Sequence, residues 1–248
     1  MQFYEQMEVP AKTIKEFQDV IAIIERCQKV KVLVAFISGN TAYGLPEYDL
    51  LKRFVYIFVH QQTNDKQMTT FHNGDIEAKG YSVEKFVAGL GRCNTTWIEI
   101  AHYPAFYIVD SDFCKRLSAL AKLAFPLDGA SIQYKYSCKV LKDDYPLYYI
   151  RHNLSRKWIF DYGKMPPIEF AKLVSATVEN EIIRKKLLEI TQAPFNLKEY
   201  PDVWEYIKRQ NNSIHMSEFK PNEAAEEQTN ILIQGTLKKY HRHLVGSQ

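Results

Sequence analysis

The stretch VLVAFISGNTAYGLPEYDLLKRFVYIFV, residues 32–59, contains two apolar runs separated by a loop rich in glycine and polar residues. Both runs are short and rich in β-branched and aromatic residues, which is typical of buried strands. Glycine and proline in the segment between them favour a loop. The sequence therefore predicts two strands, Lys29–Ile37 and Arg53–Val59, that flank one glycine-containing loop.

The segments around this stretch alternate between helical and strand patterns. From Ala11 to Gln28 apolar residues recur at helical spacing, which predicts a helix that leads into the first strand. A third strand is predicted near Thr69–Ala78. Ser82 has the character of an N-cap, and the apolar face that follows it predicts a helix through Arg92. The first half of the chain therefore combines helices and strands.

Beyond Asp110 the periodicity is almost wholly helical. We therefore predict two domains, an α/β domain at residues 1–108 and a helical domain at residues 109–248. The helices predicted in the second half lie near 113–123, 147–162, 166–174, 179–191, 197–209 and 224–240.

The composition is that of a globular protein able to bury a core, with 46% hydrophobic and 25% charged residues among 248. The formal net charge of +3 is too small to indicate a general affinity for polyanions, so any contact with nucleic acid has to be local. No apolar run reaches the length of about 18 residues that suggests a membrane helix, and the N-terminus lacks the layout of a signal peptide. We expect a cytoplasmic protein without a membrane partner.

The first strand ends in Ser38-Gly39-Asn40, which is a candidate phosphate-binding loop. Glycine lets backbone amides approach an anion, and Ser38 or Asn40 can add side-chain donors. A tight turn without a ligand is the alternative interpretation of the same three residues.

Around this loop the sequence resembles the nucleotide-binding core of the polymerase-beta nucleotidyltransferase superfamily. More closely, it resembles the YcgL-type predicted nucleotidyltransferases, also called the RNA-repair-pathway polymerase-beta family. In that family a strand ends in Ser-Gly-Ser, and an aromatic residue and a glycine follow closely. The matching residues here are Ser38, Gly39, Asn40, Tyr43 and Gly44, with Asn40 in place of the second serine.

Two further blocks extend the resemblance. Gly80–Ile100 is similar to the family's Gly-Trp-Asp-Leu-x-Lys helix with its following Asn and Glu, and Tyr148–Leu173 is similar to a helical signature of Leu-Arg, Ala-Arg-Trp and Pro-Pro-x-x-Phe. The resemblance implies an α+β fold, in which a small mixed sheet of the nucleotidyltransferase type with flanking helices is followed by a helical C-terminal half. The matching residues are Lys85, Asn94, Glu99, Arg151, Arg156, Trp158, Pro166, Pro167 and Phe170.

The chemistry that the resemblance implies needs two carboxylates on one strand and a third on a neighbouring strand, which hold two Mg²⁺ ions. Aligned without gaps from Gly44, the family pattern places Leu51 and Arg53 where the Asp-x-Asp carboxylates belong. Leucine offers no ligand atom and a guanidinium repels Mg²⁺, so no cofactor is expected in this register. The predicted nucleotide- or phosphate-binding residues are Ser38, Gly39, Asn40, Tyr43 and Arg53.

A second register shortens the loop by four residues and keeps an acid pair, Glu47 and Asp49, on one face of an extended segment. Asp75 or Glu77 would supply the third carboxylate. In this register Glu47, Asp49 and Asp75 bind Mg²⁺, and Asp49 and Asp75 are catalytic. We favour the gapless register, because it superposes the second apolar run on the family strand. His72, near Asp75, is interpreted as a turn residue in preference to a proton shuttle.

Three functions stay open at this point. The leading hypothesis is a catalytically degenerate nucleotidyltransferase-like protein that binds nucleotide or RNA, with Arg53 supplying fixed positive charge where the metal would lie. The second is an active Mg²⁺-dependent enzyme that transfers a nucleoside monophosphate to RNA or protein. The third is a protein-interaction module that inhibits or mimics an active relative, with residues 215–235 as its first candidate surface.

Overall fold

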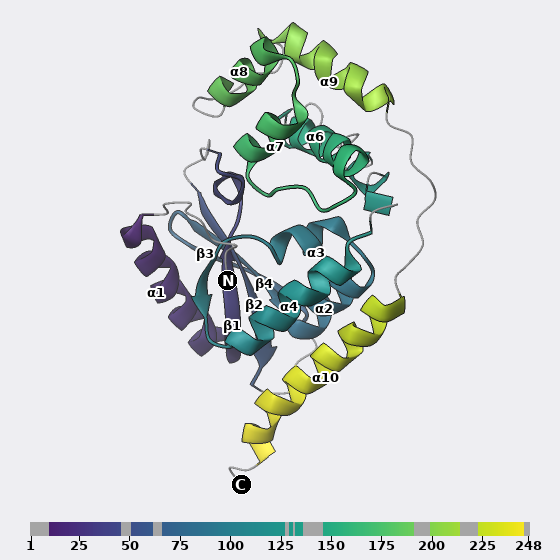
Figure 1. The fold of residues 1–248 in the computed structure, drawn as a ribbon. Helices are drawn as coiled ribbons and strands as arrows, with labels where there is room; N and C mark the ends of the chain where they lie inside the picture. Colours follow the sequence, from purple (N-terminus) through teal and green to yellow (C-terminus); the bar gives the residue numbers. More distant parts are fainter. Residues whose placement is uncertain are drawn as a thin grey trace. The chain divides into compact units, whose positions relative to one another are not determined.

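The protein divides into two compact units in the computed structural model (Figure 1). The first unit combines a sheet with helices and the described part of the second is helical, which confirms the predicted α+β fold class. The units comprise residues 1–39, 49–124 and 222–248, and residues 40–48 and 125–221. The described residues are 10–45, 51–61, 66–126, 129–130, 132–135, 146–190, 199–213 and 223–245.

Five described strands form one mixed sheet in the first unit. They are β1 (Val30–Ile37), β2 (Lys52–His60), β3 (Met68–Asn73), β4 (Ile76–Ser82) and β5 (Ala105–Ile108). Their order across the sheet is β3-β4-β2-β1-β5. β2 and β4 pair in parallel, whereas the other neighbours pair antiparallel. The two predicted strands at the centre of the sheet are therefore confirmed.

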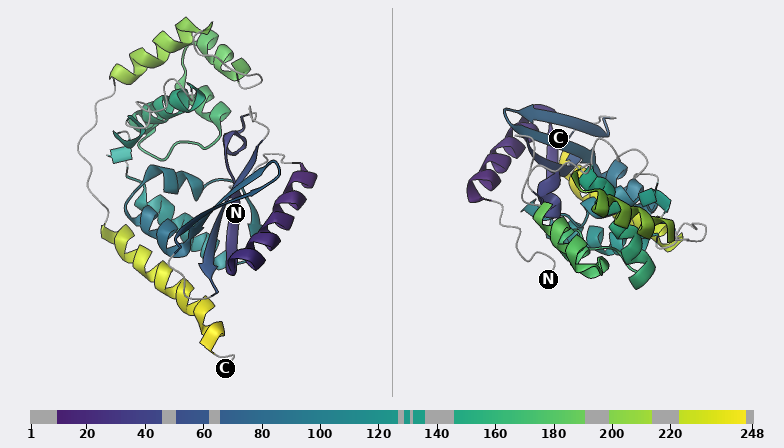
Figure 2. Two further views of the ribbon diagram at one scale, coloured as in Figure 1. Left: turned by 180° about the vertical axis from the view of Figure 1, so that it is seen from behind. Right: turned by 90° about the horizontal axis from the view of Figure 1, so that it is seen from above.

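Helices cover both faces of this sheet. The helices of the first unit are α1 (Ala11–Gln28), α2 (Val83–Gly91), α3 (Thr95–Ile100), α4 (Ser111–Ala124) and α10 (Glu223–Val245). α1 lies on one face, and α2, α4 and α10 lie on the other, as the opposite views of Figures 1 and 2 show. The Ser82 hydroxyl accepts a hydrogen bond from the Lys85 amide at 3.2 Å, which confirms the predicted N-cap of α2.

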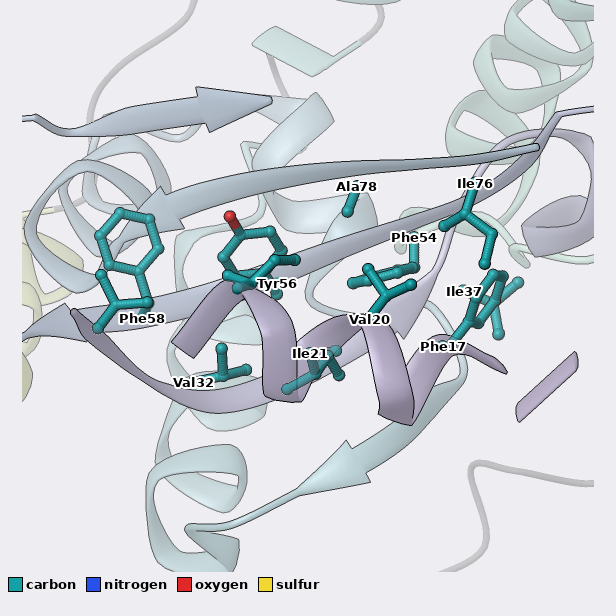
Figure 3. Close-up of a cluster of buried hydrophobic side chains, with 13 residues drawn as sticks. Phe17, Val20, Ile21, Val32, Ile37, Phe54, Tyr56, Phe58, Ile76 and Ala78 are labelled. Atoms are coloured by element: carbon teal, nitrogen blue, oxygen red, sulfur yellow. The ribbon is translucent and has the colours of Figure 1, made fainter. Parts of the chain in front are cut away.

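The core under α1 depends on the alternation of side chains along β2. Phe54, Tyr56 and Phe58 all point toward α1 (Figure 3), where Phe17 packs against Phe54 with ring centroids 4.9 Å apart. Because successive side chains of a strand face opposite sides, Arg53 lies on the face away from α1. Because these aromatic side chains are buried under α1, the Arg53 side chain must project from the opposite face.

A β-bulge at Leu33 reverses the alternation of β1. The pairing with β2 shifts between Val32 and Val34, so Val32 faces the α1 core before the bulge and Ile37 faces it afterwards. The next residue, Ser38, therefore continues on the face away from α1. The bulge puts Ser38 and Arg53 on the same side of the sheet.

The predicted third strand is two strands joined by a tight turn. β3 and β4 form an antiparallel hairpin, and Gly74 at its turn has a φ of +57°. Asn73 pairs with Ile76, so Gly74 and Asp75 form the two-residue turn, and Gly-Asp between two strands is a hairpin signal that the sequence prediction missed. His72 lies in β3, so its interpretation as a turn residue is wrong.

The described part of the second unit is built from helices and a short 3₁₀ turn, and residues 129–130 and 132–135 are also helical. Their bounds are η1 (Asn40–Tyr43), α6 (Pro146–Tyr162), α7 (Phe170–Thr177), α8 (Glu181–Ile190) and α9 (Pro201–Ser213). α6 packs against α7 and α9, and α8 against its neighbours in the chain. None of the helices within the described residues combines the length and the apolar composition that crossing a membrane requires.

The C-terminal helix α10 returns to the sheet unit. An ideal Cβ on Gly91 of α2 would overlap Thr229 of α10, so the two helices are in close contact at a glycine. Farther along α10, Lys239 and Tyr240 donate hydrogen bonds to Asp110 Oδ2 at 2.6 and 2.9 Å. The predicted domain division at residues 108 and 109 stays a prediction, although α4 and α10 pack against α2 and belong to the same compact unit as the sheet.

We expect Gly80→Ala to destabilise the first unit, because Gly80 lies opposite Tyr56 and a Cβ there would come within 2.5 Å of Tyr56 Cε2 and Oη. Overpacking of this kind costs about 1–3 kcal/mol, measurable by urea denaturation. The control is Gly235→Ala in α10, where the nearest atom to a new Cβ is Arg116 Nη1 at 3.6 Å. The control should gain up to about 1 kcal/mol, because alanine favours a helix over glycine. Equal stability of Gly80→Ala and the wild type would contradict the packing.

Asp110 should make the stability of the sheet unit depend on pH. Burial pushes its pKa up, but hydrogen bonds from Lys239, the Phe113 amide and Tyr240 outweigh this effect and hold the pKa of Asp110 below its ordinary value. The stabilisation is therefore complete above the pKa of an unfolded aspartate and is lost as the pH falls below about 4.

Asp110→Asn should cost about 1–3 kcal/mol at pH 7 and flatten the acid limb of the stability profile, measured by denaturation between pH 3 and 7. Asp112→Asn, at an exposed acid in the same helical turn, is the control. If both variants kept the wild-type profile, the cluster at Asp110 would not hold α10 in place.

Candidate functional site

A row of polar residues crosses the strands at one end of the sheet, on the face away from α1. Glu77 of β4 is paired with Arg53 of β2 on one side and with His72 of β3 on the other. Residues paired across strands project from the same face. Ser38 extends the row, because its amide donates to the Arg53 carbonyl at 3.1 Å. We call Ser38, Arg53, Glu77 and His72 the polar row.

Two cations hold the carboxylate at the centre of the polar row. Glu77 Oε1 lies 3.7 Å from Arg53 Nε and 3.2 Å from Lys79 Nζ. The side chains of Arg53 and Glu77 are only 24% and 17% exposed, so water screens this pair less than it screens a pair on the open surface. The residue that the gapless register aligns with an acid, Arg53, therefore lies beside Glu77, the carboxylate of the polar row.

These residues do not fit the Mg²⁺ site that the family resemblance implies. A magnesium ion needs several oxygen ligands around it, and the guanidinium of Arg53 lies against the carboxylate that would have to supply one. Within the described residues, no group of three or more His, Cys, Asp or Glu side chains is arranged to hold a metal ion.

Asp75, the other candidate for a third carboxylate, belongs to a different cluster. Its carboxylate lies 3.0 Å from Lys52 Nζ, which in turn lies 2.7 Å from the Glu16 carboxylate of α1. The hydrogen bond from Lys52 lowers the pKa of Asp75, and the hydrogen bonds to Glu16 and Asp75 raise the pKa of Lys52. Lys52 directs this cluster toward α1, whereas Arg53 and Glu77 lie on the opposite face. The described contacts bring Glu77, and not Asp75, to Arg53.

The candidate loop begins where β1 ends. Ser38 and Gly39 are partly exposed, and Gly39 has a φ of +73°, a conformation that glycine adopts without strain. The chain turns sharply at Gly39. This turn lies beside Arg53, because the Arg53 carbonyl accepts a hydrogen bond from the Ser38 amide. Ser38, Gly39 and Arg53 are thus brought together in the first unit.

The other two predicted binding residues, Asn40 and Tyr43, belong to the second unit. The Asn40 carbonyl accepts a hydrogen bond from the Leu45 amide at 3.0 Å and closes the turn. Tyr43 is 5% exposed, and its ring lies under the guanidinium of Arg151 at 4.1 Å. Tyr43 therefore has a packing partner that the sequence analysis did not anticipate. Glu47 and Asp49 lie outside the described residues, so the second register stays a hypothesis.

Several residues that carry the family resemblance hold local structure. Asn94 caps α3 by accepting a hydrogen bond from the Thr96 amide at 3.0 Å. The Trp158 indole donates to the Met165 carbonyl at 3.1 Å, and Phe170 is fully buried. These positions preserve the scaffold.

The sequence analysis placed Arg53 in the site but did not find Lys79 as a partner of Glu77. The signal was present in the alternation of β4, where Glu77 and Lys79 are two residues apart and must share a face. Lys79 was missed because the predicted strand ended at Ala78, whereas β4 continues to Ser82.

The mixed sheet with flanking helices and the helical second unit agree with the α+β fold that the family resemblance implies. A sequence model of the RNA repair pathway DNA polymerase beta family (RlaP) matches residues 14–233. The protein belongs to this family, which confirms the resemblance found in the sequence.

A curated relative and a solved structure are also similar to the chain. The uncharacterized protein YcgL of Bacillus subtilis (strain 168) is 24% identical over 194 residues, which cover 68% of this chain and 72% of YcgL. A crystal structure of a nucleotidyltransferase-like protein from Exiguobacterium sibiricum 255-15 overlaps 94% of this chain and 78% of its own at 7% identity. Its TM-score of 0.29 is too low to support an argument.

Restoring the acidic pair should create a metal site. We expect Leu51→Asp/Arg53→Asp to gain affinity for Mn²⁺, because the pair would restore the Asp-x-Asp spacing, residue 53 is paired with Glu77, and the competing guanidinium would be gone. The matched control, Leu51→Asn/Arg53→Asn, lacks the charges. Mn²⁺ binding is measured by electron paramagnetic resonance.

Mn²⁺ binding by the wild-type protein, measured in the same titration, distinguishes between the two registers. Tight Mn²⁺ binding by the wild type that Asp49→Ala abolishes would support the second register. Failure of the double aspartate variant to bind Mn²⁺ would contradict the position that the gapless register gives to residues 51 and 53.

Proposed function

We propose that this protein is a catalytically degenerate nucleotidyltransferase-like protein that binds the phosphate groups of a nucleotide or of RNA without a metal ion. The observation that carries the proposal is the ion pair between Arg53 and Glu77. In the gapless register this pair occupies the place where a metal ion would be held by carboxylates. A fixed cation can attract phosphate, but it cannot activate a hydroxyl for transfer as a bound metal ion does.

The charges of the site favour an anionic ligand. Arg53 and Lys79 place two cationic groups beside the Glu77 carboxylate. Ser38 and Gly39 turn the chain at the end of β1 on the same face of the sheet. Guanidinium groups form charge-assisted hydrogen bonds with phosphate oxygens, so Arg53 is the main predicted contact. The family description points to RNA as one source of that phosphate.

An active Mg²⁺-dependent nucleotidyltransferase is the second candidate function. It requires Glu47 and Asp49 to act as metal ligands in the second register. The described contacts of Asp75 favour it less, because the Asp75 carboxylate is bound by Lys52 on the α1 face. Of the candidate interaction surface at residues 215–235, residues 215–222 lie outside the described residues, and in α10 the side chains of Ala225, Thr229 and Leu232 are buried, which makes this role less favoured for the helix.

The test of the proposal is calorimetric titration with ATP in the presence of EDTA. We expect binding by the wild type, and a loss of about tenfold or more in Arg53→Ala, since a hydrogen bond to a charged group is worth about 1.5–3 kcal/mol. Arg92→Ala, at the exposed C-cap of α2 in the same unit, is the control and should bind ATP as the wild type does.

A parallel assay with labelled nucleoside triphosphates, Mg²⁺ or Mn²⁺, and RNA or lysate protein as acceptor separates the two functions. We expect no label transfer by the folded wild type. If the wild type transfers label and Asp49→Ala abolishes this transfer, the protein is an active nucleotidyltransferase instead. The absence of any ATP or RNA binding by the wild type would refute the phosphate site.

A further inference from the structure

The hairpin of β3 and β4 has one open face. Phe71 of β3 packs against the hydrophobic core under α1. The alternate residues Met68, Thr70 and His72 therefore lie on the other face of β3, and all three are exposed. On the same face of β2, by contrast, Val55 is buried. This face of the sheet is thus covered at its centre and open at the hairpin.

The open face presents cationic and hydrogen-bonding groups. β3 has the sequence Met-Thr-Thr-Phe-His-Asn and carries no acidic residue. Its pairing with β4 sets Thr70 opposite Lys79 and His72 opposite Glu77. The Lys79 side chain is 51% exposed, whereas that of Glu77, whose carboxylate lies 3.2 Å from the Lys79 ammonium, is only 17% exposed. A ligand that approaches from solvent therefore meets the ammonium and the polar side chains of β3 more readily than the carboxylate.

The polar row is longer than one phosphate group. It begins at Ser38, at the end of β1, passes Arg53 and Glu77, and ends at His72, so it crosses four adjacent strands. Neighbouring strands lie about 4.8 Å apart, which makes the row about 14 Å long. A triphosphate chain is shorter than this. A ligand that contacts both ends of the row must carry phosphates in succession, as a polynucleotide strand does.

We propose that the open face of the hairpin extends the phosphate site, and that the ligand is a nucleic-acid single strand whose phosphodiester backbone crosses β4 and β3. Arg53 and Lys79 bind one phosphate. Thr70 and His72 donate hydrogen bonds to the next one. Met68, which is 52% exposed, supplies an apolar surface beside them for a base. This inference rests on the proposed function, because it continues the site at Arg53 and narrows its ligand to a chain of phosphates.

The small number of cations in the site sets how strongly binding depends on salt. Each phosphate of a single strand that a cation neutralises contributes about −0.7 to the slope of log K against log salt concentration. With Arg53 and Lys79 as the cations, the slope should be about −1.4. Lys79→Gln should make it shallower by about 0.7, whereas Lys31→Gln, which removes a cation paired with Glu25 at 3.0 Å, should not change it.

The experiment compares ATP with adenylate single strands of increasing length, both RNA and DNA, by calorimetric titration of the full-length protein in EDTA. His72→Glu and His72→Lys place opposite charges at the β3 end of the row. His60→Glu and His60→Lys are the matched controls, because His60 is the last residue of β2, at the other end of that strand from Arg53. The melting temperature of each variant is measured alongside.

We expect the longer single strands to bind the wild type about tenfold more tightly than ATP, because they gain a second phosphate contact. His72→Lys should tighten single-strand binding and His72→Glu should weaken it, each by about tenfold, and Thr70→Lys should act as His72→Lys does. ATP affinity should change little, because β3 lies two strands, about 10 Å, from Arg53, beyond the Debye length at physiological salt. A purely structural effect would not move the affinity in opposite directions.

Three results would overturn the extension of the site while leaving ATP binding at Arg53 intact. Single strands may bind no more tightly than ATP, or His72→Glu and His72→Lys may bind them alike. The third result is a preference of more than about tenfold between RNA and DNA, since phosphate contacts do not distinguish the sugar. If the wild type binds neither ATP nor a single strand, the proposed function itself fails, and the extension fails with it.

Discussion

The parallel pairing of β2 with β4 fixes where the charged residues of the candidate site lie. Its register sets Tyr56 against Gly80 and Arg53 beside Glu77. A shift of the pairing by one residue would turn Arg53 toward the α1 core and Phe54 away from it. Burial of the aromatic side chains under α1 makes such a shift unfavourable, so the core and the polar row are determined by the same contacts.

Ion pairs surround the carboxylates at this end of the sheet. On the face away from α1, Arg53 and Lys79 neutralise Glu77, and on the α1 face Lys52 joins Asp75 to Glu16. Each carboxylate near the start of β4 therefore has a cationic side chain as its neighbour. These ion pairs are the basis of the proposed metal-independent binding of phosphate.

Contacts between distant parts of the chain complete both units. In the first unit, Asp110 accepts hydrogen bonds from Lys239 and Tyr240, which ties the C-terminal helix to α4. In the second unit, Arg151 holds Tyr43, a residue that follows closely on the first strand of the sheet. The loop after β1 is thus continuous with the sheet at one end and with a turn anchored in the helical unit at the other.

The sequence by itself determined the central strands, most helices and the family, because these depend on local periodicity and on the order of residues. It did not predict β5, whose four residues carry too little pattern to distinguish a strand. Only the tertiary structure decided that Glu77 rather than Asp75 meets Arg53, and that Arg151 covers Tyr43. Both outcomes depend on strand register, on the bulge at residue 33 and on packing between residues far apart in the chain, and side-chain periodicity alone does not encode such pairings.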